Sequence, residues 1–226
     1  MKTHTLLETA AAVTLEPLVP ATAAVIWLHG LGADGHDFVP IVGELGASAA
    51  AIRFVFPHAE AIPVTINNGY VMRAWYDILG MDLVRREDEA GLRASQARIE
   101  QLIAREVARG IPPERIVLAG FSQGCAMTLQ TGLRHPQKLA GLLCLSGYLP
   151  LGDKIAAERS PANQQTPVFM AHGRGDNVVL INRAEASREL LQGLGYAIDW
   201  HEYMMPHSVC EEEIDDIGDW LRKVLA

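Results

Sequence analysis

The segment Ile116-Val117-Leu118-Ala119-Gly120-Phe121-Ser122-Gln123-Gly124 is the most informative part of this chain. Its apolar, partly β-branched beginning predicts a buried strand, and the apolar run after Gly124 predicts a helix. Between them lies the pattern G-x-S-x-G, whose glycines relieve crowding where a strand turns sharply into a helix. Such a turn exposes the Ser122 hydroxyl and directs the first amides of the helix at a developing oxyanion. We therefore predict that Ser122 is a nucleophile, the alternative being a plain glycine turn.

Short apolar runs alternate with helix-like segments on both sides of this turn. Strands are predicted at 24–28, 52–56, 115–121, 140–145, 167–171 and 198–203, and helices at 38–47, 88–109, 123–135, 182–194 and 211–225. Uninterrupted apolar strands alternating with helices predict an α/β fold, with a largely parallel sheet covered on both faces. Ligands of such sheets bind outside the carboxyl ends of the strands, so the site is expected in the loops that follow strands. The irregular stretch 57–81 is expected to lie across the top of that site.

Length and composition narrow the class of protein. With 226 residues and 49% hydrophobic residues, the chain is expected to form one globular domain over residues 1–226. A formal net charge of -8 without a basic cluster argues against a nucleic-acid partner. The uncharged segment 116–133 is interrupted by glycine, serine and glutamine, which favours a buried strand and helix over membrane insertion.

Two features favour a cytoplasmic protein. The cysteines Cys125, Cys144 and Cys210 form an odd set without metal-ligand spacing, which suits free thiols in a reducing compartment. The N-terminal residues contain no sustained apolar stretch, so we predict no signal peptide. Cys125 follows the turn so closely that we expect it to be a small buried residue and not a second nucleophile.

In this kind of fold, the general base follows the nucleophile in the chain and lies in a loop at the carboxyl edge of the sheet. His207 meets this condition, because it lies between the last predicted strand and the last predicted helix. The other histidines after Ser122 are less suitably placed. His135 is expected at a helix end, His172 at a strand end and His201 within a strand. We predict His207 as the general base.

The acid should follow a strand that lies between the nucleophile and the base. Asp176 follows the strand predicted at 167–171, and we expect it to accept the Nδ1 proton of His207. Asp153 is the competitor, but its place before an apolar segment is typical of a helix N-cap. Asp199 lies inside a strand and Asp215 inside the last helix, where neither is placed to act.

Two backbone amides are expected to form an oxyanion hole. One is the N–H of Gln123, directly after the nucleophile, and the other is the N–H of Leu31 in the glycine-rich loop 29–35. A glycine turn without a catalytic part is the alternative for that loop. A dinucleotide site is excluded, because the glycines do not follow G-x-G-x-x-G and no acidic residue ends the next strand.

Apolar side chains near these positions are candidates for an acyl pocket. Trp75 and Leu79 offer aromatic and aliphatic surface, although such a run more often belongs to the core. Val178 and Val179, beside the predicted acid, are also expected to face an acyl chain.

Five blocks in this order resemble the phospholipase/carboxylesterase family of the α/β-hydrolase superfamily, which includes bacterial carboxylesterases and acyl-protein thioesterases. The blocks are LHGLGADG (28–35), RAWYD (73–77), GFSQG (120–124), HG (172–173) before DNVV (176–179), and PHS (206–208). The resemblance implies an α/β-hydrolase fold without a large lid, no cofactor and no metal. It also implies a Ser122-Asp176-His207 triad with oxyanion amides at Leu31 and Gln123, and it is compatible with a homodimer.

The function expected from the residues and the resemblance is hydrolysis of short- to medium-chain acyl esters through an acyl-enzyme. The alternative is an acyl-protein thioesterase or lysophospholipase, so the expected partner is a small-molecule acyl ester or thioester. A peptidase is a further use of such a triad, although an amide leaves less easily than an alkoxide. A ligand-binding module with a dead triad would lack one of its members, whereas all three candidates are present.

Overall fold

The computed structural model describes residues 3–46, 49–80 and 87–226. Its strands are β1 (His4–Glu8), β2 (Ala12–Pro17), β3 (Ala23–Leu28), β4 (Ile52–Pro57), β5 (Ala61–Val64), β6 (Tyr70–Arg73), β7 (Ile116–Phe121), β8 (Gly141–Leu145), β9 (Val168–Gly173) and β10 (Ile198–Tyr203). Its α-helices are α1 (Glu89–Ala108), α2 (Gln123–Gly132), α3 (Gly152–Glu158), α4 (Ile181–Gly193) and α5 (Glu211–Val224).

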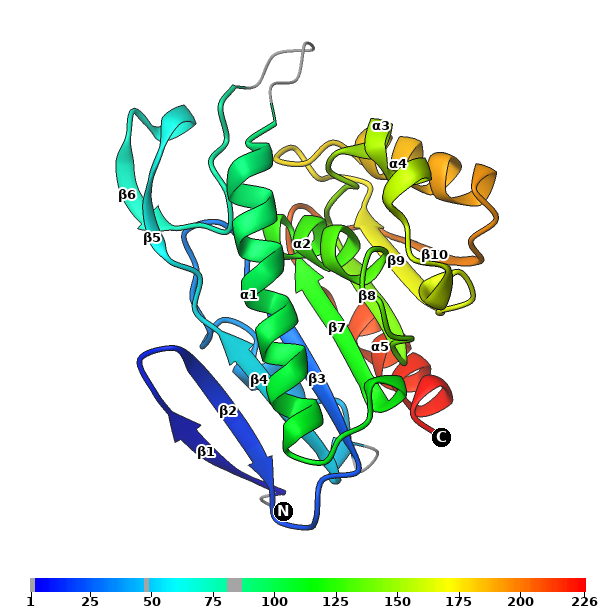
Figure 1. Cartoon of the computed structure of the whole chain (residues 1–226). Helices are drawn as coiled ribbons and strands as arrows, with labels where there is room; N and C mark the ends of the chain where they lie inside the picture. Colours follow the sequence, from blue (N-terminus) through cyan, green and yellow to red (C-terminus); the bar gives the residue numbers. More distant parts are fainter. Residues whose placement is uncertain (1–2, 47–48, 81–86) are drawn as a thin grey trace.

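The main sheet has eight strands in the order β1-β2-β4-β3-β7-β8-β9-β10. All pairs from β4 to β10 are parallel, whereas β1 and β2 add an antiparallel edge. Figure 1 shows α1 and α2 in front of this sheet and α5 behind it. The prediction of a largely parallel sheet with helices on both faces is confirmed, and the fold is that of an α/β-hydrolase.

Alternate residues of the central strands point to opposite cores. Ile26 of β3 belongs to the cluster under α1 and α2, and the next residue, Trp27, belongs to the cluster under α5. Because both faces are covered, these strands contain almost no polar residues, which is why they were predictable from the sequence.

The chain order reverses around β3, since β4 lies on one side of it and β7 on the other. Loops that leave two strands on opposite sides of such a reversal form a crevice at the carboxyl edge of the sheet. Leu28 of β3 pairs with Gly120 of β7, so the glycine-rich loop and the turn at Ser122 leave the sheet side by side.

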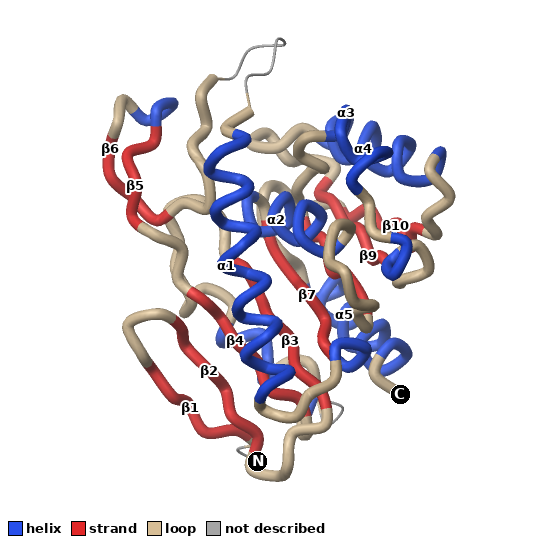
Figure 2. The backbone as a smooth tube through the Cα atoms, viewed as in Figure 1, coloured by secondary structure: helices blue, strands red, loops and turns tan. Residues whose placement is uncertain are grey.

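Several elements differ from the sequence expectations. The helix expected at 38–47 is a short 3-10 helix, Val39–Gly43, whose proline and terminal glycine are poor helix formers; residue 47 lies outside the described residues. The stretch 57–81, expected to be irregular, contains the antiparallel hairpin β5–β6, which Figure 2 shows standing apart from the main sheet. Met81 lies outside the described residues.

His4 and Ala226, near the two ends of the described chain, lie at the amino-terminal edge of the parallel strands. Nε2 of His4 lies 2.8 Å from the carbonyl oxygen of Ile52, the first residue of β4. Arg115, directly before β7, donates to the carbonyl of Ala226 at 2.9 Å. Among the residues that the structure describes, no helix is long and apolar enough to cross a membrane.

Candidate active site

Ser122 occupies a strained turn between β7 and α2. Its backbone has φ 55° and ψ −115°, in the region that side chains rarely adopt. A Cβ added to Gly120 would lie 2.2 Å from the Gly124 carbonyl oxygen, and one added to Gly124 would lie 2.1 Å from that of Leu28. The two glycines are therefore required for the turn to pack against itself and against β3.

His207 connects Ser122 to Asp176 through its two ring nitrogens. Nε2 lies 2.9 Å from Ser122 Oγ, and Nδ1 lies 2.6 Å from Asp176 Oδ2. Because a carboxylate accepts only, Nδ1 carries the proton and Nε2 is free to accept the Ser122 hydroxyl. The ring of Phe121, at a centroid distance of 4.7 Å, packs against the imidazole.

The Asp176 carboxylate is buried and held by several donors. Its Oδ1 accepts the amides of Val178 and Val179, both at 2.9 Å. Nε2 of His172 lies 3.3 Å from Oδ2 while donating to the Val179 carbonyl at 2.7 Å. This contact of His172 is not predictable from its position at a strand end, which bears only on whether His172 could be the base.

The loops that carry the acid and the base pack directly on each other. A Cβ on Gly173 would lie 2.4 Å from the Met205 carbonyl oxygen and 2.6 Å from that of Pro206. The amide of Gly175 also donates to the Met205 carbonyl, at 3.0 Å. Residues more than thirty positions apart thus meet because a glycine lets the two backbones touch.

The competing acids and histidines lie elsewhere. His135 Nδ1 interacts with the Gln137 carbonyl at 2.9 Å, and His201 lies 3.0 Å from Asp199. Asp153 lies in the first turn of α3, where Leu151 is the N-cap and no side chain caps the helix, so the expectation of an Asp153 N-cap is wrong. Asp215 is part of α5.

The loop after β3 passes against the nucleophile. A Cβ on Gly30 would lie 3.5 Å from the Cβ of Ser122. Leu31 is the next residue in the chain after this contact. Gln123 is the first residue of α2, where helix amides have no carbonyl partner within the helix. The two predicted oxyanion donors are therefore carried by adjacent segments at the same edge of the sheet.

The four residues predicted to line an acyl pocket differ in the solvent exposure of their side chains. Leu79 and Val178 are 42% and 61% exposed, whereas Trp75 and Val179 are buried. The Trp75 indole donates to the His29 carbonyl at 2.9 Å.

Burial changes the proton affinity of one group beside the site. Desolvation lowers the pKa of His29 to about 4, so the ring is neutral at pH 7. No three His, Cys, Asp or Glu side chains within residues 3–46, 49–80 and 87–226 are grouped so that they could hold a metal ion.

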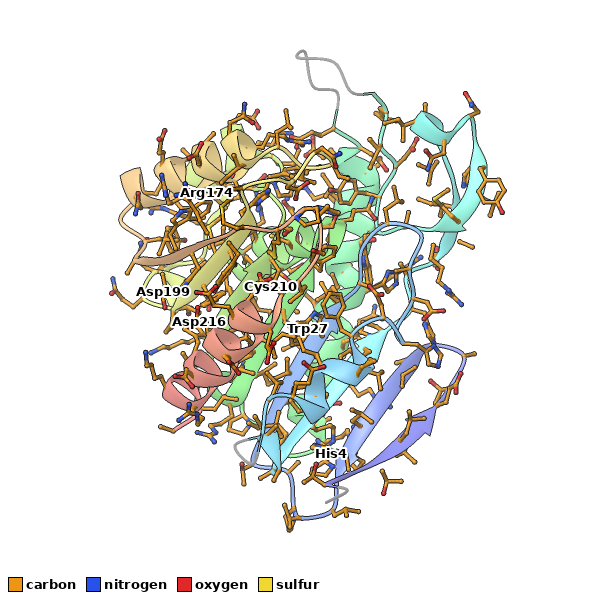
Figure 3. The ribbon with its side chains drawn as sticks, turned by 180° about the vertical axis from the view of Figure 1, so that it is seen from behind. His4, Trp27, Arg174, Asp199, Cys210 and Asp216 are labelled. Atoms are coloured by element: carbon orange, nitrogen blue, oxygen red, sulfur yellow. The ribbon has the colours of Figure 1, made fainter. Side chains whose placement is uncertain are left out.

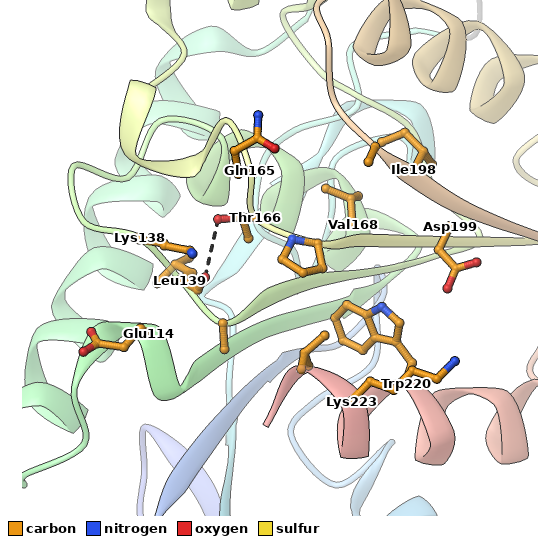
Figure 4. Close-up of a pocket in the computed structure, with 14 residues that line it drawn as sticks. Glu114, Lys138, Leu139, Gln165, Thr166, Val168, Ile198, Asp199, Trp220 and Lys223 are labelled. Atoms are coloured by element: carbon orange, nitrogen blue, oxygen red, sulfur yellow. Dashed lines mark hydrogen bonds between the residues drawn. The ribbon is translucent and has the colours of Figure 1, made fainter. Parts of the chain in front are cut away.

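A separate groove of about 760 Å³ lies at the opposite edge of the sheet. It is lined by the residues that precede or begin β8, β9 and β10, including Lys138, Pro167 and Ile198. Figure 4 shows Trp220 and Lys223 projecting into it from α5. Because this groove lies at the amino ends of the strands, it is remote from Ser122.

Comparisons with known proteins agree with the geometry. Residues 9–225 match the phospholipase/carboxylesterase family. The acyl-protein thioesterase 1 of Neurospora crassa is 44% identical, covering 92% of this chain and 91% of that protein. That of Gibberella zeae is 45% identical, covering 90% and 91%. The crystal structure of SOBER1 from Arabidopsis thaliana superposes with a TM-score of 0.86 at 31% identity, covering 90% of this chain and 99% of that one.

The match over nearly the whole chain, the relatives above 40% identity and the shared fold all lead to one assignment. This chain belongs to the phospholipase/carboxylesterase family and is a serine hydrolase of the α/β-hydrolase superfamily.

Proposed function

We propose that this enzyme hydrolyses short- to medium-chain acyl esters through a Ser122-His207-Asp176 triad. The observation that carries the proposal is the continuous contact from Ser122 Oγ to His207 Nε2 and from His207 Nδ1 to Asp176. A hydroxyl becomes a nucleophile when an adjacent base takes its proton and a third group orients that base.

In the first half-reaction, Ser122 Oγ forms a bond to the acyl carbon while its proton moves to His207 Nε2. The carbonyl oxygen becomes an oxyanion, which the amides of Leu31 and Gln123 would stabilise. The oxyanion then collapses and the bond to the leaving oxygen breaks, with His207 returning the proton to the alcohol. In the second half-reaction, His207 takes a proton from water and the hydroxide attacks the acyl-Ser122 carbonyl. The resulting oxyanion collapses, the bond to Ser122 Oγ breaks, His207 returns the proton to Oγ, and the carboxylic acid leaves.

Ser122→Ala tests the nucleophile with a chromogenic short-chain ester. We expect the burst of alcohol to disappear and kcat to fall on the order of 10⁴-fold or more. Asp176→Asn should lower kcat by roughly 10²- to 10⁴-fold through the wrong histidine tautomer. Asp153→Asn, on the exposed first turn of α3, is the matched control and should leave kcat unchanged. Wild-type turnover in Ser122→Ala would contradict the proposal.

An acyl-protein thioesterase is the second candidate, and the names of the Neurospora crassa and Gibberella zeae relatives favour it. The same triad would break a thioester, whose thiolate is a better leaving group than an alkoxide. We would compare kcat/KM for an S-acylated peptide, a lysophospholipid and a p-nitrophenyl ester of the same chain length. A preference for the acylated peptide supports the thioesterase, and a preference for the simple ester supports the carboxylesterase.

We also propose that the enzyme is located in the cytoplasm, as a monomer or a homodimer. The three cysteines are unpaired, as expected in a reducing compartment. Cell fractionation tests the location, and light scattering of the purified chain tests the dimer.

A further inference from the structure

The side chain of Gln123 is buried and uses both ends of its amide on one backbone segment. Its Oε1 accepts the amide N–H of Trp75 at 2.8 Å, and its Nε2 donates to the Tyr76 carbonyl at 2.7 Å. Gln123 is 3% exposed. Only a side chain with one acceptor and one donor side by side satisfies both groups, which a carboxylate or an ammonium group cannot do.

The same segment reaches the loop that carries Leu31 from two directions. Before Leu31, the Trp75 indole donates to the His29 carbonyl at 2.9 Å. After Leu31, the amide of Gly32 donates to the Arg73 carbonyl at 2.8 Å. Leu31 is therefore flanked by two residues whose backbones are both bonded to the segment 73–75.

The neutral ring of His29 forms further hydrogen bonds that hold the loop 29–35 in place. Its Nδ1 donates to the Gly30 carbonyl at 2.7 Å, and its Nε2 accepts the amide of Ala59 at 3.0 Å. The low pKa that burial imposes keeps Nε2 unprotonated at pH 7, so it remains an acceptor. The loop is thus bonded at His29, Gly30 and Gly32, on either side of Leu31.

We propose that the Gln123 side chain and the Trp75 indole are positioning groups that hold the two backbone donors of the oxyanion hole, Gln123 N–H and Leu31 N–H, at a fixed separation. This inference rests on the proposed function. Donors of an oxyanion hole stabilise the transition state because they are already oriented. A misplacement of about 1 Å can lower the rate on the order of 10²-fold.

Two variants remove the side-chain bonds and leave both backbone donors in place. Gln123→Met keeps the length of the side chain and loses both hydrogen bonds, and Trp75→Phe loses the indole N–H. We expect kcat to fall between about 10- and 100-fold with KM within about threefold, since the donors act only on the transition state. The inhibition constant of a trifluoromethyl ketone, whose adduct carries an oxyanion, should rise in proportion to the loss in kcat/KM.

Matched controls exist for both substitutions. Gln130→Met removes a fully buried glutamine of the same helix that donates to Gln96 of α1. Trp27→Phe removes a buried indole N–H that has no hydrogen-bond partner among the described residues, on the face of the sheet seen in Figure 3. If the controls lower kcat as much as Gln123→Met and Trp75→Phe, the effect is general packing and the proposal is wrong.

The double variant tests whether both side chains act through one structure. Because they hold the same loop, we expect the double variant to lose little more than the worse single variant. Fully additive losses would contradict the proposal. If Gln123→Met does not fold, the milder Trp75→Phe alone still tests the proposal through kcat and the inhibition constant of the trifluoromethyl ketone.

Amide hydrogen exchange supplies a readout that does not need turnover. Exchange in residues 29–33 should become at least about tenfold faster in Gln123→Met than in wild type or Gln130→Met, because the loop opens more often. Unchanged exchange in Gln123→Met overturns the proposal even if esters are hydrolysed. Failure of the proposed function is visible separately, as ester turnover that survives Ser122→Ala.

Discussion

Two buried carboxylates, Asp176 and Glu213, show how different surroundings give a carboxyl group different properties. Asp176 accepts two backbone amides and the His207 ring. Neither oxygen of Glu213 makes a hydrogen bond of good geometry to a described group, and the Cys210 backbone offers only a weak interaction. Burial accordingly raises the pKa of Glu213 to about 8, with a smaller opposing effect from the Cys210 backbone.

The raised pKa of Glu213 predicts a pH-dependent stability. Between pH 4.5 and 8 the folded chain holds a proton that the unfolded chain has released. The free energy of unfolding should therefore be highest, for this group, below pH 4.5 and decrease toward pH 8, with a slope approaching about 1.4 kcal/mol per pH unit. Urea titrations of wild type and Glu213→Gln at several pH values measure this slope.

Glu213→Gln cannot ionise, so its unfolding free energy should lack this contribution. Tyr203 and Asp216, which also face this region and share a hydrogen bond at 2.7 Å, are unchanged in the variant. Parallel pH profiles for wild type and variant would show that Glu213 has the same proton affinity in the folded and unfolded chain.

At the scale of elements, the site depends on contacts between loops that follow different strands. The loop after β9 carries Asp176, the loop after β10 carries His207, and Gly173 is where their backbones touch. Because the clashing atoms are backbone carbonyl oxygens, neither loop has a flexible side chain that could move aside.

Gly173→Ala should therefore separate the acid from the base. We expect a destabilisation of about 1–3 kcal/mol, as for overpacked sites, together with a decrease in kcat of at least about tenfold. Gly193→Ala is the control, because a Cβ at this α4 position meets no atom within 4 Å. Thermal melts and ester kinetics measure both effects, and equal behaviour of the two variants would contradict the expectation.

The elements that could be predicted from the sequence are those with a strong local signal. The strands β3 and β7 are continuous apolar runs, β4 is an apolar run with Arg53 as its one charged residue, and α1 has helical spacing with Asp88 accepting an amide as its N-cap. The hairpin β1–β2 was not predicted, because exposed Leu6 and Leu7 obscure the alternation of buried and exposed residues. The hairpin β5–β6 was missed because its mostly exposed residues lack an apolar pattern.

The same distinction applies to the site. The positions of Ser122, Asp176 and His207 were predictable because each follows a recognisable strand, and parallel strands bring such loops to one edge. The contacts of the Gln123 side-chain amide were not predictable. Its partners lie 48 and 47 residues away in the sequence, and no local pattern predicts a polar contact across that distance.

At the scale of the whole molecule, the antiparallel edge is attached to the helix layer by a network of charged groups. Arg53 of β4 donates to Glu16 of β2 and to Glu106 of α1, and Arg109 contacts both glutamates. Arg53 and Glu106 are almost completely buried. This network lies near the amino-terminal ends of the strands, far from the triad.

Arg53→Met should destabilise the protein without changing its chemistry. Removing Arg53 leaves the buried Glu106 with the partly exposed Arg109 as its remaining ion-pair partner, at a penalty of up to about 3–5 kcal/mol. We expect a lower urea midpoint and an unchanged kcat at a temperature where the variant is fully folded. A variant that melts like wild type would show that the pair adds no net stability, and a reduced kcat would show that the network influences the site.

His4 contacts the start of β4 and Ala226 contacts the residue before β7, so both residues lie on the side of the molecule facing away from Ser122. An affinity tag, a fused carrier protein or a covalent link to a resin at either end would then leave the catalytic crevice open to solution. Immobilised enzyme coupled through one terminus or the other should consequently retain similar access for bulky acylated substrates, a useful property for a reusable biocatalyst.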